Sequence, residues 1–94
     1  MIQQTKTEIK SASQLFSAPE DGNRRELVKG VLVVMSPADS EHGRIASRIL
    51  IRLSAHVEAN NLGETFAAET GFLIETDPDT VRAPDAAFVQ RREE

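Results

Sequence analysis

The clearest apolar pattern of the chain lies between residues 24 and 35. Two β-rich runs, 26–28 and 31–34, flank the dipeptide Lys29-Gly30. This dipeptide suits a two-residue hairpin turn, because Gly adopts positive φ angles without steric cost. The pattern therefore predicts an antiparallel hairpin in which Glu26 lies opposite Val33. Since both faces of the hairpin carry apolar residues, we expect it to be largely covered.

A long amphipathic helix is expected next. Ser36 or Asp39 can serve as its N-cap, and Pro37 suits the first helical position if Ser36 is the cap. Apolar residues recur at helical spacing from position 45 to 57, and residues 60–63 end the pattern, so the helix has about six turns. By the same spacing, His42 and His56 fall on the apolar face. Another face of the helix carries three arginines: Arg44, Arg48 and Arg52.

Shorter apolar runs predict three further strands. Residues 65–68 and 72–75 form two of them, and a bend at 69–71 separates the two. Residues 81–89 form the third strand, after a turn at 77–80. In this strand Asp85 would share a face with Ala87 and Val89. Near the start of the chain, Ser11 or Ser13 can cap a short helix, which a loop at 19–23 follows.

Together these elements predict an α+β fold, in which a mostly antiparallel or mixed sheet of about five strands packs on one long helix. Residues 1–23 would form an N-terminal helix and loop, and residues 24–94 would form the domain itself. A chain of 94 residues is long enough for one small domain.

Composition excludes some kinds of site and argues against some kinds of partner. The absence of Cys excludes a disulfide framework and a thiolate zinc site. The sequence has no run of about 18 apolar residues, and its first residues lack the apolar core of a signal peptide. We therefore expect a cytoplasmic protein with no membrane partner. The net charge of −4 argues against a general polyanion-binding surface, but a local basic patch is compatible with it.

Asp85 is the most informative candidate for chemistry. A carboxylate at the start of a buried strand is costly unless it is paired or binds a cation. The ordinary alternative is an aspartate that accepts backbone hydrogen bonds in a turn. Glu26 shares its predicted sheet face with three valines, so it either faces a site or reaches solvent and pairs with an arginine. His42, in the first turn of the helix, either faces the same site or packs against a loop.

Three segments, residues 26–37, 41–45 and 81–89, contain these candidates in order. They include Glu26, the pair Glu41-His42 and the pair Pro84-Asp85. With these segments, the chain from about residue 24 to 90 resembles the Uma-two (Uma2) family of putative restriction endonucleases. That family is similar to the PD-(D/E)XK nuclease superfamily. The resemblance implies a restriction-endonuclease-like fold and metal-dependent hydrolysis of phosphodiester bonds in DNA.

The resemblance also implies roles for individual residues. Asp85 matches the aspartate of the PD motif, a catalytic residue and a ligand of Mg²⁺ or Mn²⁺. Glu26 matches the acidic residue of the hairpin and is the second candidate for metal binding and catalysis. His42 matches the family's Glu-His pair and is the third catalytic candidate. Arg25 departs from the family, which commonly has an aromatic residue there. In the superfamily the next strand supplies an acid and a lysine, and this sequence stops before that strand.

The resemblance therefore implies that the chain lacks its C-terminal part, and we expect weak metal binding with little or no turnover by this polypeptide alone. The first functional hypothesis is a metal-dependent endonuclease domain acting on DNA, with the three helix arginines as candidate phosphate contacts. The alternative is a catalytically inactive remnant that self-associates or binds a partner. Because an unpaired strand edge invites pairing with another copy, we expect a homodimer or higher oligomer through an exposed sheet edge.

Overall fold

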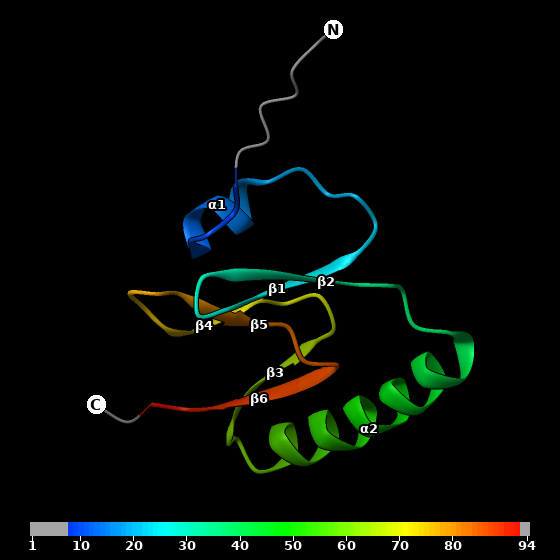
Figure 1. The fold of residues 1–94 in the computed structure, drawn as a ribbon. Helices are drawn as coiled ribbons and strands as arrows, with labels where there is room; N and C mark the ends of the chain where they lie inside the picture. The colour runs from blue at the N-terminus through cyan, green and yellow to red at the C-terminus, as the bar shows by residue number, and fades with distance from the viewer. Residues whose placement is uncertain (1–7, 93–94) are drawn as a thin grey trace, which may run out of the picture.

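The computed structural model describes residues 8–92, and its architecture is α+β, as predicted. In this range two helices accompany six strands, which form two antiparallel sheets. The helices are α1 (Ala12–Ser17) and α2 (Ser40–Ala59); the strands are β1 (Arg24–Val28), β2 (Val31–Met35), β3 (Gly63–Ala67), β4 (Phe72–Glu75), β5 (Thr80–Arg82) and β6 (Ala86–Gln90). Figure 1 shows α1 beside the larger sheet and the long helix α2 beside β3 and β6. Neither described helix has the length and apolarity needed to cross a membrane.

The hairpin of β1 and β2 forms in the predicted register, with Glu26 opposite Val33. The turn residues Lys29 and Gly30 both have positive φ angles, of 50° and 79°. Such a turn matches the right-handed twist of the flanking strands. The turn dipeptide therefore sets the position of Glu26 within the sheet.

One strand of this hairpin is more exposed than the pattern predicted. The larger sheet has the order β2-β1-β5-β4, so β2 is an edge strand and β1 is an inner strand. The expectation that the hairpin is covered on both faces is therefore wrong for β2. Three of its valines are at least one-third exposed: Val31, Val33 and Val34.

The apolar core lies between α1 and the larger sheet. Leu27 of β1 and Val81 of β5 are paired across the sheet and are 0% and 1% exposed. Ala12 and Leu15 of α1 pack against them. Burying one large apolar side chain stabilises a fold by about 1.5–3 kcal/mol. The N-terminal helix therefore shares one core with the sheet that carries Glu26.

The long helix α2 packs on the smaller sheet, which consists of β3 and β6. Asp39 is its N-cap and accepts a hydrogen bond from the His42 backbone N–H at 2.9 Å. The second of the two predicted caps is thus the one used. Val57 is buried, and Thr65 of β3 donates a hydrogen bond to Ser54 at 3.2 Å. Four residues of the predicted apolar face are exposed instead: His42, Ile45, Ile49 and His56.

The prediction of a single strand over residues 81–89 is wrong. The chain forms β5 in the larger sheet and β6 in the smaller one, with Ala83, Pro84 and Asp85 between them. The Ala83 N–H donates to the buried Glu26 carboxylate at 2.6 Å, and Pro84 has no N–H to donate. Both residues are therefore withdrawn from strand pairing. Asp85 precedes β6 and therefore does not share a strand face with Ala87. The expectation that the two residues share a face is wrong.

Candidate functional site

Asp85 lies where the chain passes from one sheet to the other, and both of its carboxylate oxygens are engaged. Arg24 Nη1, at the start of β1, donates to Oδ1 at 2.5 Å. His42 Nε2, in the first turn of α2, lies 2.9 Å from Oδ2. The fold thus brings a guanidinium, an imidazole and a carboxylate together from three distant parts of the chain. We call these three residues the Asp85 cluster.

The electrostatic environment favours the ionised form of Asp85. The hydrogen bond from the Arg24 guanidinium lowers the pKa of the Asp85 carboxyl below its ordinary value of 3.8; burial opposes this change and the charge of His42 adds to it. At neutral pH the group is therefore a carboxylate. Because its side chain is 38% exposed, solvent screens its contacts with Arg24 and His42 and limits their contribution to stability.

Glu26 lies next to the cluster and holds the segment that leads to it. Glu26 is only 9% exposed. Its Oε2 accepts the Ala83 N–H at 2.6 Å, and its Oε1 accepts a hydrogen bond from Arg82 Nη1 at 3.1 Å. Ala83 precedes Asp85 by two positions. The structure therefore brings two of the predicted site residues, His42 and Asp85, into contact and places the third behind them.

Arg24 was not among the predicted site residues. It begins β1, and because side chains alternate along a strand, it lies on the same face as Glu26. That spacing is the signal that could have placed Arg24 near the site. Its Nε–H is buried and has no acceptor among the described residues. Buried donors are nearly always satisfied, so this group is an exception among the described residues.

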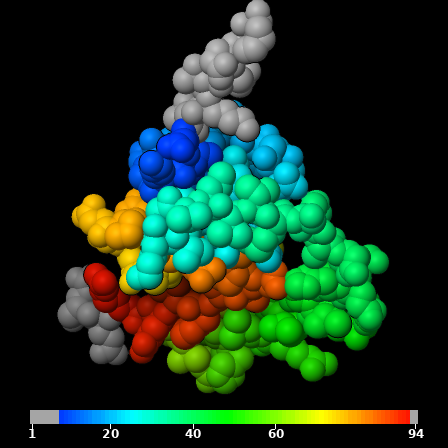
Figure 2. Space-filling view, viewed as in Figure 1, coloured from blue at the N-terminus to red at the C-terminus, as the bar shows by residue number. Residues whose placement is uncertain are grey.

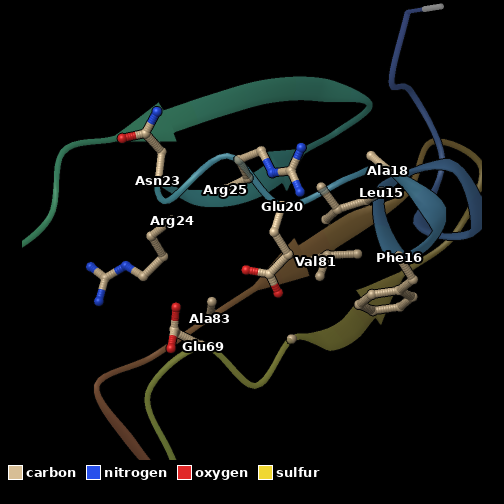
Figure 3. Close-up of a pocket in the computed structure, with 11 residues that line it drawn as sticks. Leu15, Phe16, Ala18, Glu20, Asn23, Arg24, Arg25, Glu69, Val81 and Ala83 are labelled. Carbon is tan, nitrogen blue, oxygen red and sulfur yellow. The ribbon is translucent and has the colours of Figure 1, made fainter.

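Two cavities meet at Arg24. One, of about 200 Å³, lies beside α1, with Leu15 and Phe16 on its wall. Figure 3 shows Arg24 at the border of this cavity, with its guanidinium extending away from these two residues. The other cavity, of about 390 Å³, is lined by all three residues of the Asp85 cluster and by the start of α2. Glu69, which the sequence placed in a bend without a role, lines both.

The groups around Asp85 do not provide the oxygen ligands that the expected divalent cation needs. Mg²⁺ requires near-octahedral coordination by oxygen atoms. Both oxygens of Asp85 face Arg24 or His42, and both oxygens of Glu26 accept N–H groups. Between residues 8 and 92, no group of three or more His, Asp or Glu side chains is arranged to hold a metal ion. As placed, the cluster offers hydrogen-bond donors where a cation would need ligands.

The arginines predicted to contact nucleic acid lie on the exposed surface of α2. Arg44 Nη2 pairs with Glu41 at 3.0 Å, one turn earlier in the helix. None of the three belongs to the described wall of the cavity at the Asp85 cluster. A role in nucleic-acid binding would therefore extend from the helix surface and not from the cavity itself. The three residues are Arg44, Arg48 and Arg52.

Comparison with known protein families confirms the resemblance that the ordered segments indicated. Residues 12–94 match the family Uma2, which is described as "Putative restriction endonuclease". The matched span begins at the first residue of α1 and contains Glu26 and the whole Asp85 cluster. No curated protein matches the chain.

Glu26→Ala should destabilise the fold, because it leaves the Ala83 N–H without its acceptor at a buried position. An unsatisfied buried donor costs about 1–3 kcal/mol. We expect the free energy of unfolding, measured by urea denaturation, to fall by this amount. Glu58→Ala, at an exposed position of α2, is the matched control and should change it by less than about 0.5 kcal/mol. Equal effects of the two substitutions would contradict the role of Glu26.

The ion pairs of Asp85 should make stability depend on pH in the acid range. Because the folded pKa is lowered, the stabilisation is present above the unfolded pKa, near 3.8, and is lost as pH falls through the folded value. Wild type should therefore melt at a higher temperature than Asp85→Asn at neutral pH, and the two melting temperatures should converge below pH 3.8.

Circular dichroism melting curves from neutral to acid pH measure this convergence. The exposed turn residue Asp77 provides the control Asp77→Asn, which removes one carboxylate elsewhere and should show no such convergence. A difference between wild type and Asp85→Asn that stays constant over the whole pH range would show that the Asp85 ion pairs do not contribute.

Removing the guanidinium of Arg24 should allow a divalent cation to bind more tightly. In Arg24→Met, Oδ1 of Asp85 loses its donor and the local positive charge falls. Titration calorimetry with Mn²⁺ should show tighter binding to this variant than to wild type. Arg52→Met gives the same change in net charge on the exposed surface of α2 and should leave the affinity unchanged. Equal affinities of the two variants would rule out competition between Arg24 and a cation.

Proposed function

Because the chain belongs to the Uma2 family of putative restriction endonucleases, we propose that it is a nuclease-like domain whose Asp85 cluster acts on phosphodiester bonds of DNA. The family supports the nuclease-like function, and the substrate and the reaction at this cluster are the proposal. A single observation carries it. Three groups meet at the wall of one cavity: the ionised carboxylate of Asp85, the imidazole of His42 and the guanidinium of Arg24. The Arg24 guanidinium has an N–H without an acceptor among residues 8–92.

Each member of the cluster can supply a group that phosphodiester hydrolysis needs. Hydrolysis adds water across a P–O bond, so it requires positive charge near the phosphate oxygens and a proton acceptor near the attacking water. The Arg24 guanidinium matches phosphate geometry. The Asp85 carboxylate is ionised and can orient water by accepting its hydrogen bonds. The imidazole of His42 can transfer a proton between the attacking water and the bulk solvent.

A more specific part of this proposal is that the hydrolysis depends on Mg²⁺ or Mn²⁺. A divalent cation and the Arg24 guanidinium would compete for the same carboxylate oxygen. This competition supports the expectation of weak metal binding. Metal dependence stays a prediction, and the calorimetric comparison of Arg24→Met with wild type tests the competition between Arg24 and a cation without any measurement of activity.

A second candidate is a catalytically inactive module that self-associates or binds a partner. The observation that favours it is that the carboxylates of Asp85 and Glu26 are both bonded to other groups of the same chain. Asp85 accepts from Arg24 and contacts His42, while Glu26 accepts from Arg82 and from the backbone. Ion pairs of this kind can serve to join two parts of a fold without any reaction.

Nicking of supercoiled plasmid DNA distinguishes the two candidates. With the protein in excess over DNA and either Mg²⁺ or Mn²⁺ present, we expect slow conversion of supercoiled to open-circular DNA. Asp85→Asn should abolish the conversion, because it removes the charge of the carboxylate. Asp77→Asn should leave it unchanged and controls for the loss of one exposed carboxylate. Nicking no faster than with Asp85→Asn, under both cations, would reject the hydrolase and favour the inactive module.

A further inference from the structure

Strand β6 has an edge to which no other strand of residues 8–92 is paired. A sheet of two strands is marginal by itself, and an unpaired edge carries free N–H and C=O groups. Figure 2 shows the C-terminal segment, in red and orange, at the surface between the hairpin and α2. The edge of β6 is therefore accessible to another strand.

The ladder between β6 and β3 determines which backbone groups face this edge. Arg91 N–H donates to the Leu62 carbonyl at 2.7 Å, and Val89 lies opposite Glu64 in the same register. In an antiparallel ladder, successive residues point their N–H and C=O groups to opposite sides. The odd-numbered residues of β6 thus bond to β3. The even-numbered residues face the open edge: Ala86, Phe88 and Gln90.

One register of a two-fold pairing between two copies of β6 uses all three open residues. It is centred on Phe88, which pairs with the partner subunit's Phe88, while Ala86 pairs with the partner subunit's Gln90. A shift of the register toward the start of the strand places Gln90 opposite Pro84, which has no N–H. The register centred on Phe88 therefore satisfies the edge within the bounds of β6. Because a two-fold contact uses the same edge of both copies, it closes at a dimer.

Charge at the two ends of β6 favours the same register. Asp85 precedes the strand and Arg91 follows it, so each Asp85 lies opposite the partner subunit's Arg91. The symmetry repeats this pair at the other end. Directly opposed residues of unlike charge stabilise antiparallel pairing, here as an addition to the contacts of Asp85 with Arg24 and His42. The edge strand β2 has only apolar residues from Val31 to Met35, and no register of two β2 strands can oppose unlike charges within it.

Apolar groups beside the edge complete the surface. Phe88 is 41% exposed although it lies directly opposite Thr65, whose side chain reaches α2 through Ser54. A groove of about 400 Å³ runs between α2 and the start of β6 and includes Ile45, Ile49 and Ala86. Because Ala86 pairs with the partner subunit's Gln90 in this register, the end of the partner's strand would lie over the groove.

We propose that two copies of this chain associate through antiparallel pairing of their β6 strands, centred on Phe88. The pairing joins the two small sheets into one sheet of four strands and covers the groove beside α2. It also brings the partner subunit's Arg91 next to Asp85, so each cluster receives a residue from the other copy. The proposal does not depend on nuclease activity and stands or falls separately from it.

Light scattering after size-exclusion chromatography tests the dimer in the full chain. At tens of micromolar, wild type should have twice the mass of the 10.3 kDa chain. Arg91→Glu opposes two like charges at each end of the pairing, and we expect it to raise the dimer dissociation constant about tenfold or more. Arg92→Glu has the same net charge and should change the constant by less than about threefold. A monomer mass for wild type at these concentrations, or equal effects of the two variants, would overturn the proposal.

Cysteine cross-linking tests the register itself, since the chain has no Cys of its own. In Phe88→Cys the two sulfurs meet across the axis, where Cα atoms of a hydrogen-bonded pair are about 5.5 Å apart, within the range of a disulfide. Oxidised glutathione should convert this variant to a covalent dimer. Val89→Cys, which faces the partner subunit's Ala87, should remain uncross-linked under the same conditions. Cross-linking of Val89→Cys in preference to Phe88→Cys would overturn this register.

Discussion

The hydrogen bond from the Ala83 N–H to the buried Glu26 carboxylate is the interaction on which the arrangement of the site depends. It forms at 2.6 Å at the point where the chain leaves the larger sheet. This bond takes the Ala83 N–H out of strand pairing, and Pro84, which has no N–H, follows it before Asp85. The carboxylate thus ends one strand and directs the chain toward the second sheet. A buried acid can do this because a backbone N–H satisfies one of its oxygens and Arg82 satisfies the other.

The site follows from this change of direction. Asp85 comes to lie between the start of β1 and the first turn of α2, where Arg24 and His42 reach it. The Asp39 cap fixes the first turn of the helix through the backbone N–H of His42, and strand alternation fixes the side of β1 from which Arg24 points. Each member of the cluster is thus set by a local rule, while Asp85 is also placed by the bond of Glu26 to Ala83 and by the pairing of β5 and β6 in different sheets.

The parts of the fold that the sequence predicted are those with a local signal. The Lys29-Gly30 turn and the Asp39 cap each act within a few residues, and both appear in the structure. Pro84 was a local signal for the division of residues 81–89 into two strands, since it has no N–H for strand pairing, but the apolar residues at 86–89 favoured one continuous strand. Which sheet each half joins depends on pairing partners far away in the chain.

The candidate site shows the same contrast between features with a local signal and features that depend on distant parts of the chain. Asp85 and His42 were singled out by their places at the start of a predicted strand and helix and by the family resemblance, and the structure brings them within hydrogen-bonding distance. Their third partner, Arg24, lies 61 positions from Asp85, and its place two residues before Glu26 on the same strand face was a signal that the prediction did not use. The role of Glu26 was also hidden, since its bond to the Ala83 backbone depends on the pairing of β1 with β5.

Asp85 is held from two directions, by Arg24 of the larger sheet and by His42 of the helix that covers the smaller one. The carboxylate therefore acts as a latch between two halves of the molecule that have separate sheets. Whatever takes one of its oxygens, whether a proton, a cation or a second subunit, also loosens one side of that latch. A ligand of this single side chain would therefore remove a contact between the two halves at the same atoms where the proposed chemistry takes place.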